Sequence, residues 1–162
     1  MPTAQFEAKR CFLMAEQQLN STPENIFPLL CPTREYEWIE TWKCDLIYSD
    51  SGLAELCCIF KTNFPREKEE IWITNLFEPN KLIQFLRVSE KLVIRYTINL
   101  SANEKGDTTA IWVQVITALN EEGNQYIEAC SNVEFGKNIK GLEKMLNHYL
   151  ETGKMLRTEV VK

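Results

Sequence analysis

The sequence FGKNIKGLEKMLNHYL, residues 135–150, contains the apolar face of a long helix near the end of the chain. Its apolar residues recur every three or four positions, which is the spacing of one helical face. They are Phe135, Ile139, Leu142, Leu146, Tyr149 and Leu150. Strand-like runs precede this helical region of roughly 120–156, so the helix can bury its apolar face only against their sheet. The order of elements predicts an α+β fold with a space between helix and sheet.

Three glycines divide this helical region. Gly123 and Gly136 are poor helix formers, so either the first part is a separate short helix or the helix bends near Gly136. Gly153 is expected to end the helix. His148, the one histidine of the chain, lies off the apolar face, and we expect it to point toward solvent.

Upstream, residues with a period of two predict seven strands. The predicted strands are Gln5–Leu19, Lys43–Ser49, Leu53–Thr62, Ile71–Phe77, Lys81–Val88, Leu92–Leu100 and Thr108–Leu119. Leu92–Leu100 alternates most regularly, and Asp50-Ser51-Gly52 is typical of a hairpin turn. Because the connections are short, neighbouring strands should pair antiparallel.

The segment between the first two strands has helix signals instead. Thr22 can cap a helix, Pro23 suits its first position, and Glu24 favours the positive end of the helix dipole. This helix must be short because prolines follow at positions 28 and 32. A second short turn is expected over residues 33–38.

Length and composition favour a single globular domain over residues 1–162. Hydrophobic residues make up 44% of the chain, and its net charge is −5. The basic residues are scattered among more numerous acids, which argues against nucleic acid as a partner. No apolar run is long enough to insert into a membrane. Met1–Lys9 lacks the apolar centre of a signal peptide, so we expect a cytoplasmic protein whose six cysteines are thiols acting as small hydrophobic residues.

Several kinds of chemistry have no residues to support them. One histidine and no C-x-x-C pair make a metal site improbable. Gly136 and Gly141 are spaced as in a phosphate-binding loop, but no Lys-Ser/Thr follows. We therefore expect no metal and no cofactor, and we assign no catalytic residue. Two polar residues, Arg87 and Gln114, fall on the face of their strand that otherwise carries apolar residues. Each either reaches solvent at a strand end or orients a ligand.

Three segments carry a resemblance to a known superfamily. Ser21–Phe27 (STPENIF) is similar to its "A-P-x-E-x-V-[FW]" start of the first helix, and Phe77–Ile83 (FEPNKLI) to its "Y-x-P-P-[RK]-x-[IL]" turn. Thr117–Asn124, with Gly141–Leu150 behind it, looks like its strand-to-helix junction and final helix. In this order, the segments resemble the START-like helix-grip superfamily, including polyketide cyclases/dehydrases and Hsp90-ATPase-activator-like bacterial proteins.

The resemblance implies a helix-grip fold: a curved seven-stranded antiparallel sheet around a long C-terminal helix, with two short helices between strands one and two. It also implies an apolar cavity for a hydrophobic small molecule, such as a lipid or a polyketide-like compound. The expected ligand-binding residues are Trp72, Phe85, Arg87, Tyr96, Trp112, Gln114, Phe135, Ile139 and Leu142. The ligand should place a polar or anionic group near Arg87 or Gln114.

Two alternative functions stay open beside ligand binding. A cyclase/dehydrase-type enzyme would need an inward acid or base, for which Tyr96 and Glu55 are the best candidates. A protein-interaction module similar to the Hsp90 ATPase activator would have a collapsed cavity and a functional outer surface. The superfamily has no universal catalytic residue, so no activity follows from the fold.

The strand over residues 108–119 also predicts an assembly. If Trp112, Gln114 and Ile116 face the helix, the alternate residues face outward. These are Ile111, Val113 and Val115. Such an apolar outer patch is rarely exposed by a monomer, so we expect either a homodimer through it or another element covering it.

Overall fold

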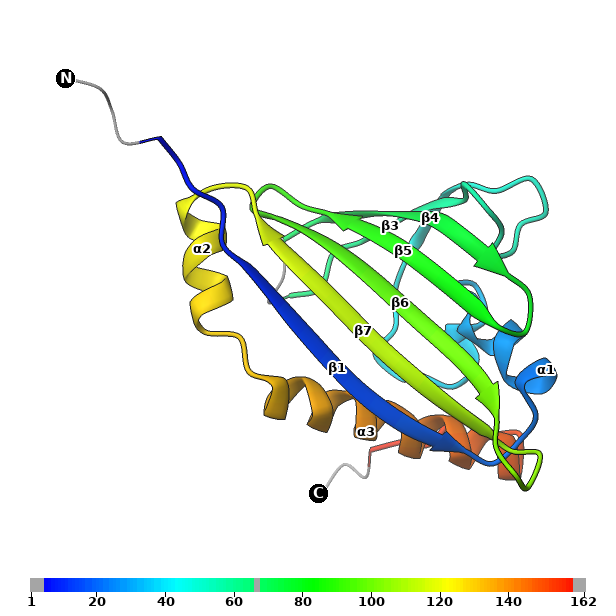
Figure 1. Ribbon diagram of the computed structural model, residues 1–162. Coiled ribbons are helices and arrows are strands. Elements are labelled where there is room, and N and C mark those ends of the chain that lie inside the picture. Colours follow the sequence, from blue (N-terminus) through cyan, green and yellow to red (C-terminus); the bar gives the residue numbers. More distant parts are fainter. Residues whose placement is uncertain (1–4, 66–67, 159–162) are drawn as a thin grey trace.

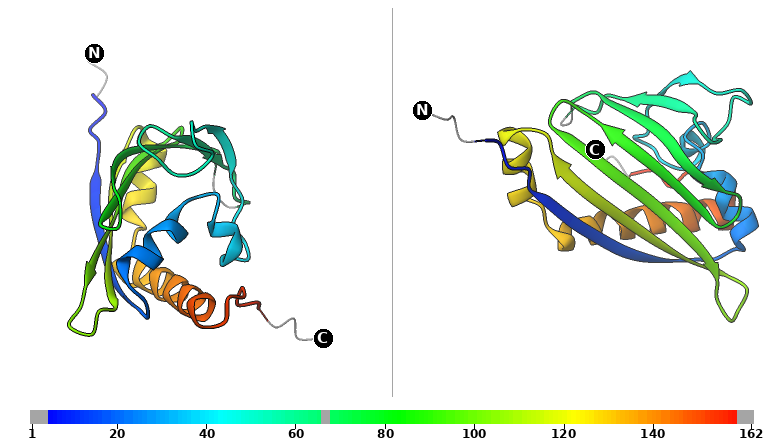
Figure 2. Two further views of the ribbon diagram at one scale, coloured as in Figure 1. Left: turned by 90° about the vertical axis from the view of Figure 1, so that its right-hand side faces the viewer. Right: turned by 45° about the horizontal axis from the view of Figure 1, so that its top comes forward.

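The computed structural model describes residues 5–65 and 68–158, so the first four residues of the Met1–Lys9 segment lie outside the described residues. The strands are β1 (Arg10–Leu19), β2 (Asp45–Tyr48), β3 (Ile59–Thr62), β4 (Glu70–Glu78), β5 (Leu82–Val88), β6 (Leu92–Ala102) and β7 (Thr108–Ala118). They form one antiparallel sheet in the order β1-β7-β6-β5-β4-β3-β2. The sheet curves over the helices, which lie on its concave side (Figures 1 and 2). The predicted seven-stranded α+β helix-grip fold is confirmed.

The central strands follow the alternation of their side chains. In β6, the five apolar residues of one parity are buried on the concave side: Leu92, Ile94, Tyr96, Ile98 and Leu100. The turn into β7 is built by Asn103, whose side-chain oxygen accepts hydrogen bonds from two backbone N–H groups. Gly106 takes the positive φ of 81° that this turn requires.

The short helices between β1 and β2 form as their sequence predicts. Helix α1 (Pro23–Ile26) has Thr22 as its N-cap, and the Thr22 side chain accepts a hydrogen bond from the Asn25 N–H. Two 3₁₀ turns follow, η1 (Phe27–Leu30) and η2 (Glu35–Glu37). Trp38 anchors them, because its fully buried indole donates to the Leu29 carbonyl at 2.8 Å.

The C-terminal helical region is two helices. Helix α2 (Glu121–Glu128) is capped by Asn120, and helix α3 (Asn132–Thr152) is capped by Ser131. The break therefore falls just before Ser131, so the separate short helix is confirmed and the bend at Gly136 is wrong. Gly153 ends α3 in the left-handed conformation, with its N–H bonded to the Tyr149 carbonyl at 2.7 Å, as predicted.

The predicted strand over Leu53–Thr62 is wrong in its first half. Only Ile59–Thr62 pairs in the sheet, and residues 49–58 form an irregular connection rather than a tight hairpin. Cys57 has a positive φ of 67°, which interrupts the extended backbone. The carboxylate of Glu55 also accepts hydrogen bonds from Ser49 and from the backbone of Asp50, which folds the connection on itself. Local hydrogen bonds thus outcompete strand pairing here.

Helix α3 is tied to the edge strand β1 by side chains along its length. Its Asn132, Glu143 and Asn147 side chains accept hydrogen bonds from backbone N–H groups in and just beyond β1, at 2.8–3.0 Å. Deeper inside, fully buried Gln17 donates to the Ile139 carbonyl and accepts from the Trp112 indole, both at 2.8 Å. These contacts fix the position of α3 across the concave face. In the described part of the chain, no helix is long and apolar enough to cross a membrane.

Helix α2 lies against the end of the sheet at Gly123. A Cβ atom at this position would collide with the Lys91 carbonyl oxygen and lie 3.1 Å from Ala118 Cβ. The Lys91 carbonyl also accepts a hydrogen bond from Leu119 N–H, so it cannot move without breaking that bond. Gly123 is therefore required by close packing, whereas Gly136 has open space around it.

We predict that Gly123→Ala lowers the free energy of unfolding by roughly 1–3 kcal/mol, the usual cost of overpacking. The matched control, Gly136→Ala, should instead gain about 0.5–1 kcal/mol, because alanine is the better helix former. Urea denaturation of both variants measures the difference. Equal midpoints for the two variants would contradict the packing of α2 described above.

Candidate functional site

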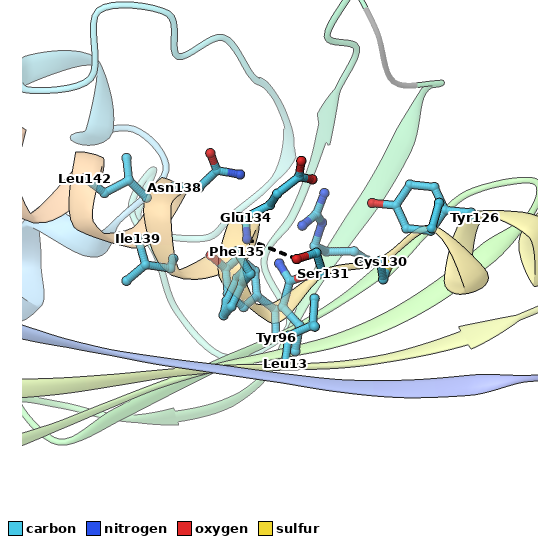
Figure 3. A pocket seen from close by; sticks show the side chains of 13 residues that line it. Leu13, Tyr96, Tyr126, Cys130, Ser131, Glu134, Phe135, Asn138, Ile139 and Leu142 are labelled. Atoms are coloured by element: carbon cyan, nitrogen blue, oxygen red, sulfur yellow. Dashed lines mark hydrogen bonds between the residues drawn. The ribbon is translucent and has the colours of Figure 1, made fainter.

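A pocket of about 330 Å³ lies between the concave face of the sheet and the region where α2 passes into α3 (Figure 3). Its sheet side is formed by residues of β1, β5, β6 and β7, and its other side by α2, α3 and the segment between them. The lining residues are Leu13, Arg87, Tyr96, Gln114, Tyr126, Ala129, Cys130, Ser131, Glu134, Phe135, Asn138, Ile139 and Leu142. The break before Ser131 creates this pocket, because it lets α3 leave the sheet at a different angle from α2 (Figure 1).

Polar groups come from the sheet side of the pocket. Tyr96 and Gln114 are direct cross-strand partners on β6 and β7, and each is more than nine-tenths buried. Arg87 comes from β5, and its guanidinium lies 4.4 Å from the centre of the Trp72 ring and 5.6 Å from that of Tyr96. The pocket therefore offers a phenol, an amide and a stacked guanidinium together.

Arg87 is held by a buried ion pair. Its Nε donates to the Glu70 carboxylate at 2.7 Å, and only 11% and 8% of the two side chains are exposed. The sequence left two roles open for Arg87. Because its side chain is buried, Arg87 is not a strand-end residue that reaches solvent. Removing one member of a buried pair leaves the other charge without compensation, so the pair is also structural.

Tyr96 is a protonated phenol at neutral pH. Burial raises the pKa of its hydroxyl, and the charge of Glu35 raises it further. The positive charge of Arg87 and a hydrogen bond from Gln114 act in the opposite direction. Burial dominates, so Tyr96 can donate a hydrogen bond to a ligand but does not act as a base.

The predicted ligand-binding residues divide into two groups. Six of them line the pocket: Arg87, Tyr96, Gln114, Phe135, Ile139 and Leu142. Trp72, Phe85 and Trp112 instead belong to an aromatic cluster beside the pocket. Neighbouring rings in this cluster have centres 5.1–6.4 Å apart, and its members are Trp42, Phe60, Trp72, Phe85, Tyr96 and Trp112. This cluster separates the pocket from a second one of about 280 Å³, which lies between η1 and the β4–β5 turn and is lined by Phe27, Phe77 and Ile83 among others.

Sequence reasoning missed the residues that surround the helix break. Tyr126, Ala129, Cys130 and Ser131 line the pocket because α2 ends there. Glu134 and Asn138 also line it, although both are exposed and lie beside the apolar face of α3. The helix cap at Ser131 was the available signal, since Ser followed by Glu three residues later is typical of a helix start.

Two other titratable residues lie differently from expectation. Glu55 belongs to the β2–β3 connection and does not line the pocket, so its assignment as an inward carboxylate is wrong. His148 is half-buried on α3, away from the pocket lining, rather than solvent-exposed. Among residues 5–65 and 68–158, no cluster of His, Cys, Asp and Glu could hold a metal ion.

Glu35, in η2, is a carboxylate that sequence reasoning did not identify. It is half-buried, and burial raises the pKa of its carboxyl well above the usual range. Its charge reaches Tyr96 on β6 and the thiol of Cys44, where it raises both pKa values. Glu35 therefore faces the interior between η2 and the sheet, and its ionisation opposes folding.

We predict that Glu35→Gln stabilises the protein at pH 7 and has less effect as the pH falls toward the ordinary carboxyl pKa. The folded protein binds this proton more tightly than the unfolded chain does. The free energy of unfolding should therefore fall as the pH rises from the ordinary pKa through the raised one. Thermal or urea unfolding between pH 4 and pH 8 measures the effect.

The neighbouring Glu37 is a control of opposite sign. Hydrogen bonds from Arg34 and Tyr149 lower the pKa of its carboxyl. Its contribution to stability is present above the ordinary pKa and disappears as the pH falls through the lowered one. Glu37→Gln should therefore lose stability at pH 7, and a stabilisation equal to that of Glu35→Gln would contradict the interior placement of Glu35.

No protein-family model matches the chain, and no curated protein matches its sequence. Solved structures do match its fold. Protein MLL2253 of Mesorhizobium loti has a TM-score of 0.63 and 16% identity, covering 85% of this chain and 98% of that chain. Major latex-like protein 151 of Panax ginseng has a TM-score of 0.64 and 10% identity, over 86% and 97%. The Aha1 dimer of Colwellia psychrerythraea has a TM-score of 0.56 and 16% identity, over 85% and 96%. The chain therefore has the START-like helix-grip fold that its sequence motifs predicted.

Proposed function

We propose that the protein binds a small molecule in the pocket between the sheet and the α2–α3 junction. One observation carries this proposal. The polar side chains of Arg87, Tyr96 and Gln114 are largely buried, and they line a pocket of about 330 Å³ instead of being covered by other side chains. Buried polar groups that open into a pocket fix the orientation of ligands in binding sites.

The lining restricts the chemistry of the ligand. Leu13, Phe135 and Ile139 provide an apolar wall for a flat or ring-shaped body. Arg87 is already neutralised by Glu70, and Glu134 adds a negative charge to the lining. An uncharged ligand with hydroxyl or carbonyl oxygens fits better than the anionic group proposed from the sequence.

The size of the pocket favours a compact ligand. Its volume lies at the lower end of the roughly 300–1,000 Å³ that is usual for small-molecule sites. The aromatic cluster occupies the space into which a long acyl chain would extend. A ring-shaped, polyketide-like compound is therefore favoured over a long-chain lipid.

We also propose that the protein is cytoplasmic, as the sequence led us to expect.

The two alternative functions have less support. An enzyme of the cyclase/dehydrase type needs an acid or base beside the ligand. Tyr96 remains protonated, and the exposed Glu134 is the carboxylate in the pocket lining. A protein-interaction module with a collapsed cavity is disfavoured by the pocket itself.

We predict that the protein binds 2-naphthol, a neutral hydroxylated ring, more tightly than 2-naphthoate, its anionic counterpart. Gln114→Leu should weaken 2-naphthol binding about tenfold, since losing one hydrogen bond in a buried site costs ~1–1.5 kcal/mol. Isothermal titration calorimetry measures both comparisons.

Gln84→Leu is the matched control for this experiment. Gln84 lies on the outer face of β5, where it accepts a hydrogen bond from Thr97 and does not contact the pocket. The same substitution there should leave 2-naphthol binding unchanged. Equal binding by the two variants and the wild-type protein, or no binding by any of them, would count against the pocket as a site for such ligands.

We also propose that the protein forms a homodimer through the outer face of the sheet. Ile111, Val113 and Val115 are half-buried and point away from the helices. Their partners on β1 extend the apolar surface, with Met14 opposite Val113 and Phe12 opposite Val115. Met14 is 52% exposed and Phe12 is 63% exposed.

The outer face has no covering element in the described part of the chain, since the helices all lie on the concave side (Figure 2). Apolar patches of this kind usually mark interfaces. The outer patch also carries both signs of charge, Glu16 on β1 and Arg95 on β6, as a self-complementary surface requires. The Colwellia Aha1 structure of the same fold is a dimer.

We predict a concentration-dependent dimer that Val113→Asp weakens at least tenfold, because a carboxylate in an apolar interface loses its hydration. Sedimentation velocity over micromolar to high micromolar concentrations measures the shift. Leu56→Asp is the matched control, since Leu56 is 57% exposed in the β2–β3 connection, at the opposite edge of the sheet from β1. A wild-type protein that stays monomeric at the highest concentration would refute the dimer.

A further inference from the structure

Two cysteines far apart in the sequence meet beside the pocket. Cys11 belongs to β1, and Cys130 belongs to the segment between α2 and α3. The Cys11 thiol lies near enough to Cys130 to raise the pKa of the Cys130 thiol. Both side chains are half-buried and pack against the hydrophobic core, and Cys130 also lines the pocket.

The hydrogen bonds around the two thiols hold them in this position. On one side of Cys11, the Lys9 N–H donates to the Asn124 side chain of α2 at 2.8 Å. On the other side, the Met14 N–H donates to the Asn132 side chain of α3 at 3.0 Å. The backbone of β1 is therefore tied to both helices, and Cys11 faces the segment that joins them.

The other four cysteines have different surroundings. Cys31 contacts the Thr33 hydroxyl, and Cys58 contacts the Thr74 hydroxyl, both at 3.1 Å. Cys44 donates to the Pro32 carbonyl, and Cys57 is exposed beside Cys58. All six cysteines lie within the described residues, and among them Cys130 is the one whose thiol pKa is raised by another cysteine, Cys11.

We propose that Cys11 and Cys130 are a redox site that forms a reversible disulfide between β1 and the α2–α3 segment. The bond would fix one wall of the pocket, because it joins the edge strand to the residues at the helix break. This inference does not depend on the ligand proposed above, since the disulfide and its effect on stability are measured without any ligand.

The two thiols have different roles in the exchange. Burial, with the added charge of Cys11, raises the pKa of Cys130 to about 12, so Cys130 stays protonated at neutral pH. Cys11 is therefore the attacking group, because the thiolate is the reactive form of cysteine.

The oxidant is a small disulfide such as oxidised glutathione. The Cys11 thiolate attacks one of its sulfurs, breaks the glutathione S–S bond and releases one glutathione thiolate. Cys130 then gives its proton to a thiolate and attacks the Cys11 sulfur, which expels the second glutathione. The two protein thiols lose two electrons, and one oxidised glutathione becomes two glutathione thiols.

The test uses the purified full chain without reductant. The folded protein is incubated with oxidised glutathione, its remaining thiols are alkylated, and the digest is mapped by mass spectrometry. We expect one linked peptide pair joining Cys11 to Cys130 and an upward shift in the thermal unfolding midpoint, because the bond closes a long loop. Reduction should reverse both changes.

Two variants and one control complete the experiment. Cys130→Ser should leave Cys11 as a mixed disulfide with glutathione and abolish the midpoint shift, and Cys11→Ala should abolish both the link and the shift. Cys44→Ser, at another half-buried cysteine, should keep the Cys11–Cys130 link. Alkylation of all six thiols in the oxidised wild-type sample, or a link through Cys57 or another cysteine instead, would overturn the proposal.

Discussion

The position of α3 across the concave face depends on one buried glutamine. Gln17 is fully buried, and a buried amide must be hydrogen-bonded to be tolerated. It satisfies this requirement by donating to the Ile139 carbonyl of α3 and accepting from the Trp112 indole of β7. Apolar contacts alone would let the helix slide along the sheet. These two directional bonds set its register, and the register sets which residues enclose the pocket.

The packing of α3 against the sheet covers one edge strand and leaves the other exposed. At β1, the side chains of Asn132, Glu143 and Asn147 on α3 accept hydrogen bonds from the outward N–H groups, so this edge is covered. At the other edge, β2 is short and exposed along its whole length. The same helix therefore packs the core, covers an edge strand and forms a wall of the pocket.

Polarity is concentrated at one end of the concave side. Aromatic rings from Trp42 to Trp112 fill the centre, and their packing leaves little open space there. Arg87, Tyr96 and Gln114 lie at the edge of this cluster, where the helix break leaves a pocket. The sheet thus supplies the polar groups, and the break between α2 and α3 makes them accessible.

The sequence by itself determined the elements whose signals are local. The alternation in Leu92–Ala102 and Thr108–Ala118 requires a sheet, and the caps at Thr22 and Gly153 define helix ends through contacts within a few residues. The parity of Tyr96 and Gln114 likewise placed both on the helix side of the sheet. The alternation in Leu53–Cys58 was misleading because Glu55 bonds within its own loop and the positive φ of Cys57 interrupts the strand, so only Cys57 and Cys58 reach β4, through Thr74.

Only the tertiary structure decided which residues face the pocket and which carry unusual chemistry. Trp112 and Gln114 share one face of β7, yet the first packs in the aromatic cluster and the second lines the pocket, according to the register of α3. Glu35 and the Cys11–Cys130 pair depend on contacts between segments distant in sequence. Periodicity indicates which face of a strand or helix a residue occupies. Which other segment covers the residue on that face is decided by long-range packing, which no local pattern encodes.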